Sequence, residues 1–475
     1  MKNIVFFFCD ELRPDALGCY GNAAGDMHTP NIDSIAKRGH LFENCFCNSP
    51  VCVPSRTSIM TGLYPEDTGV YDNEAALPAF TLPGSFLTFP KVLHESGYHT
   101  ASFGKTHLPP QMHPFERDNK QGSEMNLGLS ALERETLHKI SPRGALSFNM
   151  ASLYPQDKEY YPETVTSNAL DWMAKQADPY FIRISYTQPH SPIIVKRGYE
   201  TIYKDYPFSG KLPDISHLSE FEQAFAQAIA LDTVTEEELI QAKACYYGMV
   251  SWIDDEIGKV LHFLQAQGQL DNTILILGAD HGALRGECRG LGKHIFHRAS
   301  QSVPLIIATP DDKGDKRIST LCSNIDLPKT IFHLAGIEAP PQFKGVNLFS
   351  GHDPQAVYAT IGYGEYDSCA FPARQLGRLS GDRGWPRRSC IRTKQYRLDM
   401  NTRVNGVYPS LSEADIFFVD CEKYPDEDFN MADDPAYAPI INDLISKLSA
   451  HCSSPVEVNP DLLHIPADMV AGTRQ

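Results

Sequence analysis

Short apolar runs recur along this chain of 475 residues, and each leads into polar residues. Residues 4–8 read Ile-Val-Phe-Phe-Phe without a polar face, which is typical of a parallel strand buried on both sides. Similar runs follow at residues 98–103, 180–186, 273–277 and 303–308. Between them, helical patterns mark residues 29–36, 89–96, 164–175, 236–267 and 326–334. This alternation predicts an α/β fold with a large, mostly parallel sheet flanked by helices.

Polar side chains follow three of these predicted strands. Asp10, His190, Asp280 and His281 each come shortly after an apolar run. Because parallel sheets bind ligands beyond the carboxyl ends of their strands, we expect these four side chains to meet at one edge.

The longest predicted helix covers residues 236–267, as one helix or two abutting ones. Apolar residues recur there at helical spacing and predict a buried stripe of Val250, Ile253, Ile257, Val260, Leu261 and Leu264. Residues 109–155 are polar and punctuated by Pro, Gly and Ser, so we expect an irregular insertion near the mouth of the active site.

The pattern loosens after about residue 350. Residues 392–400 and 416–420 predict antiparallel strands, and residues 437–448 predict a terminal helix. We therefore expect a catalytic α/β domain over residues 1–350. A smaller C-terminal α+β subdomain with an antiparallel sheet would follow over residues 351–475.

Composition limits the partners of the protein. The formal net charge of −17 argues against nucleic acid, and no apolar run approaches the roughly 20 residues of a membrane span. The apolar run near Met1 is too short for a signal peptide, and the twelve cysteines show no disulfide-framework spacing. These features predict a cytoplasmic protein with no membrane partner. Four of the thiols are expected to pack near the site, namely Cys9, Cys19, Cys45 and Cys47.

Two motifs carry the chemistry. The segment C-V-P-S-R occupies residues 52–56, and G-Y-H-T-A-S-F-G-K-T-H occupies residues 97–107. If a helix begins near Pro54, Arg56 shares a face with Cys52, four residues earlier. The N-terminus of such a helix offers N–H groups and positive potential to an anion.

Taken alone, Cys52 has three other interpretations. A single cysteine is most often a small buried apolar residue. A thiol phosphatase holds phosphate in a C-x5-R loop, for which Arg56 comes too early. A zinc site from Cys45, Cys47 and Cys52 lacks the usual C-x2-C pair.

Together, and in this order, the two motifs resemble the signatures of the type I sulfatases of the alkaline phosphatase superfamily. The resemblance implies an alkaline-phosphatase-like fold and oxidation of Cys52 to formylglycine by a formylglycine-generating enzyme. An aldehyde hydrate has two hydroxyls on one carbon, so one can attack sulfur and the other can later expel sulfate. A serine would instead stall as a stable sulfate ester.

The resemblance also implies the partners of Cys52. Asp10, Glu11, Asp280 and His281 are similar to the ligands of one divalent cation. Calcium is the first choice, with manganese or magnesium as alternatives. Residues similar to sulfate-binding and proton-transfer groups are Arg56, Lys105, His107, His190 and Lys293. His294 and His297 match no family role and are interpreted as structural.

The expected reaction is hydrolysis of a sulfate monoester, on a small molecule or a saccharide, to an alcohol and inorganic sulfate. The nearest alternative is a phosphonate monoester or phosphodiester hydrolase, since its substrate is also a singly charged tetrahedral ester. A catalytically silent binding protein is a third reading. Sequence does not identify the leaving alcohol or the oligomeric state. Four C-terminal arginines suit either an acidic substrate or a solvated surface: Arg374, Arg378, Arg387 and Arg388.

Overall fold

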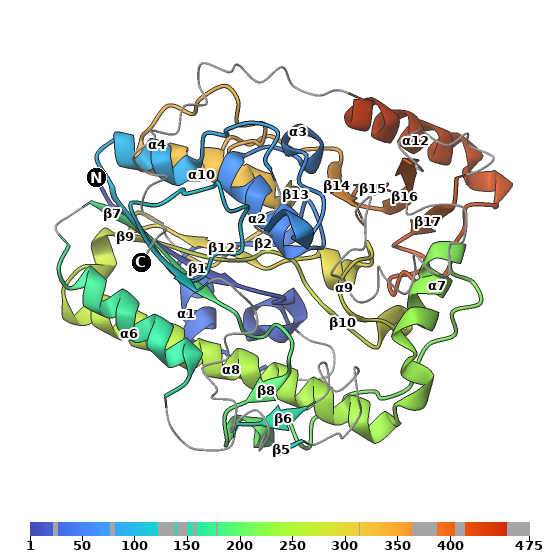
Figure 1. The fold of residues 1–475 in the computed structure, drawn as a ribbon, viewed down its shortest axis with the longest axis horizontal. Coiled ribbons are helices and arrows are strands. Elements are labelled where there is room, and N and C mark those ends of the chain that lie inside the picture. The colour runs from blue at the N-terminus through green and yellow to red at the C-terminus, as the bar shows by residue number, and fades with distance from the viewer. Residues whose placement is uncertain are drawn as a thin grey trace.

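The computed structural model of the protein describes residues 1–21, 27–76, 81–121, 138–139, 151–154, 159–176, 179–312, 314–362, 387–403 and 414–453. A central sheet lies between two layers of helices, and a smaller sheet stands at one end of it (Figure 1). Among the described residues, no helix combines the length and the apolar character needed to cross a membrane.

The central sheet has eight strands in the order β13-β2-β12-β9-β1-β7-β3-β4. Their bounds are β1 (Asn3–Cys9), β2 (His40–Phe46), β3 (His99–Lys105), β4 (Arg117–Gln121), β7 (Tyr180–Tyr186), β9 (Thr273–Ala279), β12 (Leu305–Ala308) and β13 (Lys316–Ser323). Of these eight, β12 is antiparallel to both of its neighbours and the others pair in parallel. The expected large, mixed and mostly parallel sheet is confirmed.

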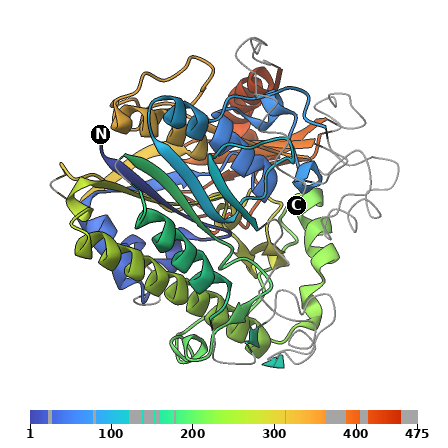
Figure 2. The same ribbon diagram turned by 60° about the vertical axis from the view of Figure 1, so that its left-hand side comes forward.

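Helices cover both faces of this sheet (Figures 1 and 2). One face carries α1 (Pro30–Arg38), α6 (Tyr161–Met173) and α8 (Glu236–Ala266). The other carries α2 (Cys52–Thr61), α4 (Phe89–Glu95) and α10 (Leu327–Ala335). Because β1 is covered on both sides, Ile4 through Cys9 are fully buried. Each buried Phe or Ile side chain contributes about 1.5–3 kcal/mol relative to exposure.

The long predicted helix is a single element, α8. It begins with a capping box, in which Thr235 Oγ1 accepts from the N–H of Glu238 and the Glu238 carboxylate accepts from the N–H of Thr235. Five members of the predicted stripe are buried and Leu261 is half-buried.

The smaller sheet is antiparallel, in the order β14 (Val357–Ile361), β15 (Arg387–Arg392), β16 (Tyr396–Arg403), β17 (Ile416–Asp420). Its side chains alternate between two cores. Phe417 and Val419 pack with α7 (Glu220–Ile229), whereas Phe418 packs with α12 (Ala438–Ser453). The expected C-terminal antiparallel sheet and terminal helix are therefore present, although the division at residue 350 stays a prediction.

The single strand predicted over residues 392–400 is wrong in part, since residue 392 ends β15 and residues 396–400 belong to β16. The chain turns between β15 and β16, because the N–H of Thr393 donates to the Tyr396 carbonyl at 2.8 Å. In return, the Thr393 hydroxyl accepts from the N–H of Tyr396 at 2.8 Å. These two bonds close a hairpin and pair Arg392 with Arg397.

The prediction of an irregular insertion over residues 109–155 is also wrong in part, since residues 117–121 form edge strand β4 beside β3. Two short pairings lie nearby, of β6 (Ser152–Leu153) with β5 (His138–Lys139) and β8 (Ile194–Val195). Residues 122–137 and 140–150 lie outside the described residues. Strands β2 and β13 were not predicted, and much of β13 is exposed and lacks an apolar run.

Candidate active site

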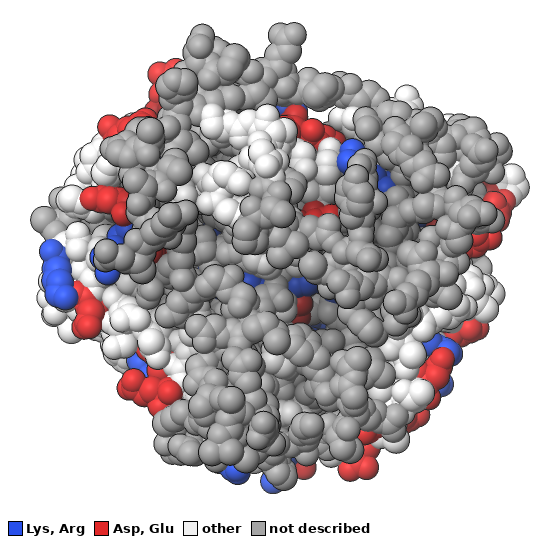
Figure 3. Space-filling view, viewed as in Figure 1, with Lys and Arg blue, Asp and Glu red and all other residues white. Residues whose placement is uncertain are grey.

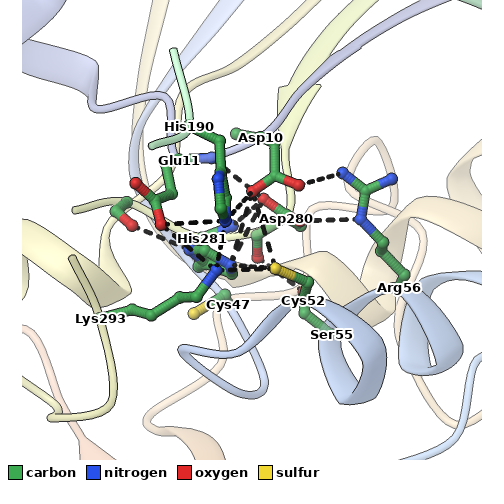
Figure 4. A network of polar contacts seen from close by, with 12 residues as sticks. Asp10, Glu11, Cys47, Cys52, Ser55, Arg56, His190, Asp280, His281 and Lys293 are labelled. Carbon is green, nitrogen blue, oxygen red and sulfur yellow. Dashed lines mark hydrogen bonds and ion pairs between the residues drawn. The ribbon is translucent and has the colours of Figure 1, made fainter. Parts of the chain in front are cut away.

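The carboxyl ends of four strands bring the predicted site residues together (Figure 4). Asp10 and Glu11 follow β1, Asp280 follows β9, and Lys105 ends β3. His190 lies on the loop after β7. All ten residues predicted for the site contact at least one other member of the set.

Helix α2 delivers Cys52 to this edge. The helix begins at Cys52 itself, two residues before the predicted start, and all of its residues are buried. The N–H of Val53, which has no intrahelical partner in the first turn, donates to Asn73 Oδ1 at 3.0 Å. The helix ends at Gly62, whose φ of 64° is left-handed. A Cβ at this position would lie 2.3 Å from the Phe343 ring, so glycine is required.

Arg56 organises the carboxylates. Its Nε donates to Asp280 Oδ2 at 2.8 Å and its Nη2 to Asp10 Oδ2 at 2.9 Å. Its Nη1 donates to the carbonyl of Lys105 at 2.9 Å. One fully buried guanidinium therefore holds together the carboxyl ends of β1, β9 and β3, where Asp10, Asp280 and Lys105 lie.

Cations surround the thiol of Cys52. Its Sγ lies 2.8 Å from Lys293 Nζ, 3.3 Å from His281 Nε2 and 3.9 Å from Lys105 Nζ. Burial disfavours the thiolate, but these three groups outweigh burial and hold the pKa of Cys52 well below its usual range. His107, at a φ of 44°, adds a side-chain hydrogen bond. The position is built to stabilise negative charge.

A second cluster stands beside the thiol. His190 Nδ1 donates to the carbonyl of Ser191, and its Nε2 lies 2.9 Å from Lys293 Nζ. Glu11 Oε1 lies 3.2 Å from Lys293 Nζ and 3.4 Å from His190 Nε2.

Sequence reasoning missed Arg285, which anchors this cluster. Its Nη2 lies 3.2 Å from Glu11 Oε2, and its guanidinium stacks 4.5 Å from the centre of the Tyr246 ring. The Tyr246 hydroxyl donates to the Glu11 carbonyl at 2.5 Å. An arginine in sequence carries no mark of such burial, so no pattern would have found it.

The donor atoms for a cation fall into two overlapping groups. Donors of Asp10, Cys52, Asp280 and His281 lie within 4.8 Å of one another, as do those of Asp10, Glu11 and His190. His281 Nδ1 donates to the Gly282 carbonyl at 2.8 Å, so Nε2 faces the first group and would be the ligand atom once a cation displaces its proton.

The electrostatics of this donor set fit a divalent cation. Burial, followed by the charge of Asp10, raises the pKa of Asp280 above its ordinary value. Asp10 and Asp280 share the Arg56 guanidinium, and Lys105 also pairs with Asp10. Their carboxylate oxygens are donors of the kind that a hard divalent cation prefers. Glu11 belongs only to the second group, where Lys293, His190 and Arg285 surround its carboxylate.

The site residues differ in their exposure to solvent. Lys293 and His190 retain slight exposure and His107 is half-buried, whereas Cys52, Asp10 and Asp280 are fully enclosed. Near the middle of the face in Figure 3, basic and acidic atoms lie side by side in a hollow.

Three further residues singled out in the sequence lie outside the group of ten predicted site residues. His297 is structural as expected, since its Nδ1 accepts from the N–H of Ala299 and its Nε2 contacts the Asp426 carbonyl. His294 is buried beside Lys293 at a φ of 89°. Both readings of Arg388 are wrong, because it is fully buried in ion pairs with Asp399 and Asp415.

Of the other C-terminal arginines, Arg387 stacks 3.4 Å from the centre of the Tyr71 ring. Arg374 and Arg378 lie outside the described residues. Of the four cysteines expected to pack near the site, Cys9, Cys45 and Cys47 are buried and Cys19 is half-buried.

Comparison with known proteins agrees with this geometry. The sulfatase family model matches residues 2–337, and the model for the C-terminal part of N-sulphoglucosamine sulphohydrolase matches residues 286–453. Choline-sulfatase of Rhizobium meliloti is 29% identical over 427 residues, which cover 80% of each chain.

Two solved structures share the fold. A protein in complex with its substrate D-glucosamine-2-N,6-O-disulfate has a TM-score of 0.70 at 22% identity, covering 95% of this chain and 97% of that one. Phosphonate monoester hydrolase of Agrobacterium radiobacter has a TM-score of 0.76 at 22% identity, covering 95% and 96%. Since the sulfatase model spans well over half of the sequence, this chain belongs to the sulfatase family and is a sulfuric ester hydrolase.

Proposed function

We propose that this enzyme hydrolyses a sulfate monoester through a formylglycine hydrate made from Cys52. The observation that carries the proposal is the convergence of Lys105, Lys293 and His281 on one buried sulfur at the start of α2. In the mature enzyme this sulfur would be replaced by the oxygens of the hydrate. The hydrate would supply a nucleophile with two hydroxyls on one carbon, so that sulfate can be both accepted and expelled.

The surrounding side chains divide the work. Lys105 and Lys293 bind the sulfate oxygens, and His107, which hydrogen-bonds residue 52, takes the proton of the attacking hydroxyl. When the bond between sulfur and the ester oxygen breaks, negative charge grows on the leaving oxygen. Lys293 and His190, 2.9 Å apart, stand together to protonate it.

Asp10, Asp280 and His281, with Glu11, are the residues proposed to hold one divalent cation. The cation would supply fixed positive charge beside residue 52, which favours loss of a proton there. Oxygen donors favour calcium, and the imidazole of His281 moves the preference towards manganese.

Phosphonate monoester hydrolysis is the second candidate, since its substrate is also a singly charged tetrahedral ester. The Asp280-His281 pair and a shared fold with a phosphonate monoester hydrolase favour it as the alternative. The neighbour bound to a glucosamine disulfate makes carbohydrate sulfates part of the proposed substrate range.

Two measurements test the proposal. Side-by-side kinetics with nitrophenyl sulfate, glucosamine sulfates and phenyl phosphonate esters should give the highest kcat/KM for a sulfate. The mass of the peptide that contains Cys52 should show conversion of the thiol to the aldehyde. An active enzyme whose Cys52 remains entirely a thiol would contradict the mechanism. A phosphonate preferred over every sulfate would favour the alternative.

A further inference from the structure

Lys293 lies on a segment with little regular structure. Between β11 (Leu291–Gly292) and α9 (Arg298–Gln301), residues 293–297 form no helix or strand. Yet Lys293 Nζ reaches both Cys52 and His190, at 2.8 and 2.9 Å. A long, flexible side chain holds such a position only when its backbone is fixed from outside the segment.

The C-terminal sheet supplies that restraint. Arg392 of β15 donates from Nη2 to the carbonyl of Phe296 at 2.9 Å and from Nε to Gln301 Oε1 at 3.1 Å. Its Nη1 pairs with Glu427 Oε1 at 2.6 Å, and Nη2 reaches Glu427 Oε2 at 3.1 Å. Glu427 Oε2 in turn accepts from the N–H of Arg298 at 3.0 Å. The Arg392–Glu427 ion pair therefore binds the backbone at Phe296 and Arg298, three and five residues after Lys293.

The opposite side of the segment is tied to the nucleophile. The N–H of His294 donates to the carbonyl of Pro50 at 3.3 Å, two residues before Cys52. The N–H of Cys47 donates to the carbonyl of Gln301 at 2.8 Å. The segment thus spans from the Cys52 loop to the C-terminal sheet, and Lys293 lies between the two anchors.

We propose that the Arg392–Glu427 pair is a positioning device for Lys293, through which the C-terminal region completes the active site. The inference rests on the proposed role of Lys293 at the leaving oxygen. Both side chains are almost completely buried, and a buried ion pair is weak evidence for stability alone. Its bidentate geometry and backbone contacts instead specify one arrangement of the segment. The family model that spans residues 286–453 covers the Lys293 segment and the C-terminal sheet as one unit.

The test compares Arg392→Gln with Arg388→Gln. Arg388 is an equally buried arginine of the same strand, but its partners are Asp399, Asn401 and Asp415, and it makes no described contact with residues 291–301. Each variant is assayed with nitrophenyl sulfate and with an alkyl sulfate, whose leaving oxygen needs more help. We expect Arg392→Gln to lower kcat for the alkyl sulfate about 10–100-fold and to affect nitrophenyl sulfate much less. Arg388→Gln should leave this ratio unchanged.

A double-mutant cycle separates positioning from general damage. In a Lys293→Ala background, Arg392→Gln should cost little further kcat, because the group it positions is gone. Full additivity, or equal slowing of both substrates, overturns the proposal.

If Arg392→Gln does not fold, Arg392→Lys keeps the charge but loses the forked contact, and the same ratio is measured. Amide exchange of residues 293–301 should quicken in either Arg392 variant and not in Arg388→Gln. If the wild-type enzyme turns over no sulfate ester, the proposed function is refuted instead. Amide exchange of residues 293–301 would still show whether the Arg392–Glu427 pair fixes this segment.

Discussion

Two buried arginines, Arg56 and Arg388, stand in nearly the same surroundings. Each is fully buried, each bridges two carboxylates, and each lies over a phenylalanine ring, Phe8 at 5.0 Å and Phe221 at 4.7 Å. Their neighbourhoods differ in how charge is matched. Near Arg388, a second arginine also pairs with carboxylates, since Arg397 contacts Asp399, Glu222 and Glu427.

Around Arg56 the paired charges converge on Cys52. Asp10 and Asp280 share the guanidinium, Lys105 pairs with Asp10 and Lys293 with Glu11. Both lysines also face the Cys52 sulfur. Like charges held close in a buried place cost stability, and they persist where a ligand completes them. The charged groups of the C-terminal network pair with one another, whereas the network at the strand ends would be completed by the proposed cation and a substrate anion. The same pairing thus serves structure in one region and chemistry in the other.

The largest expected effect concerns Cys52. Cys52→Ala and Cys52→Ser should both fold, since a small buried side chain is replaced by one of similar or smaller size, but neither should turn over. Serine accepts sulfate and has no second hydroxyl to expel it. Steady-state assays and circular dichroism check this. Sustained turnover by Cys52→Ser above background would refute the formylglycine chemistry.

Next, Asp280→Ala should lose the bound cation and activity together. Asp280 supplies a donor of the first metal group and also a partner of Arg56. Metal analysis of the purified variant and anomalous diffraction from wild-type crystals measure the cation. Wild-type crystals grown with metal and showing no ion beside Asp10 and Asp280 would contradict the site.

The paired arginines provide the most direct test of the comparison. Arg56→Gln and Arg388→Gln should each lower the free energy of unfolding by about 3–5 kcal/mol, because each leaves buried carboxylates without their partner. Urea denaturation measures this loss. Only Arg56→Gln should also lose the cation and kcat. Loss of metal in Arg388→Gln would show that the two networks are not independent.

The smallest expected effect is a pH dependence of folding stability that arises from His451 in the C-terminal region. His451 of α12 stacks on Tyr358 at 4.1 Å, and burial, followed by the charge of Lys344, lowers its pKa from 6.5 to about 4. The folded state therefore favours neutral imidazole. This contribution is complete above pH 6.5 and is lost as the pH falls towards 4. It amounts to roughly 2–3 kcal/mol.

His451→Phe keeps the stacked ring but cannot take up a proton. Between pH 6.5 and 4 the variant should lose less stability than the wild type, as measured by urea denaturation at each pH. Parallel losses in the two proteins would show that another group accounts for the acid sensitivity.

Sequence reasoning succeeded where the signal is local. The apolar run over residues 180–186 matches β7 at both ends, and the spacing in α2 places Arg56 one turn after Cys52. Polar residues after predicted strands also proved to be neighbours, because parallel strands end at one edge of a sheet.

It failed where distant segments decide the outcome. Arg388 and Arg285 look like surface arginines in sequence, but their partners are brought to them by strand pairing and by the α8 contact. The turn at Thr393 is closed by one backbone bond and one bond to its hydroxyl, and β4 pairs with the edge of β3. The cytoplasmic location and the division at residue 350 stay predictions.

The complete enclosure of Cys52 has a consequence for timing. With α2 in place, no part of this residue meets solvent, so no second enzyme can reach it on the finished fold. Oxidation to formylglycine, as proposed, therefore has to precede closure of α2 against the sheet. On this proposal, maturation would compete with folding for each newly made chain. The active fraction of a preparation would then be set during synthesis, and later treatment of folded protein should not raise it.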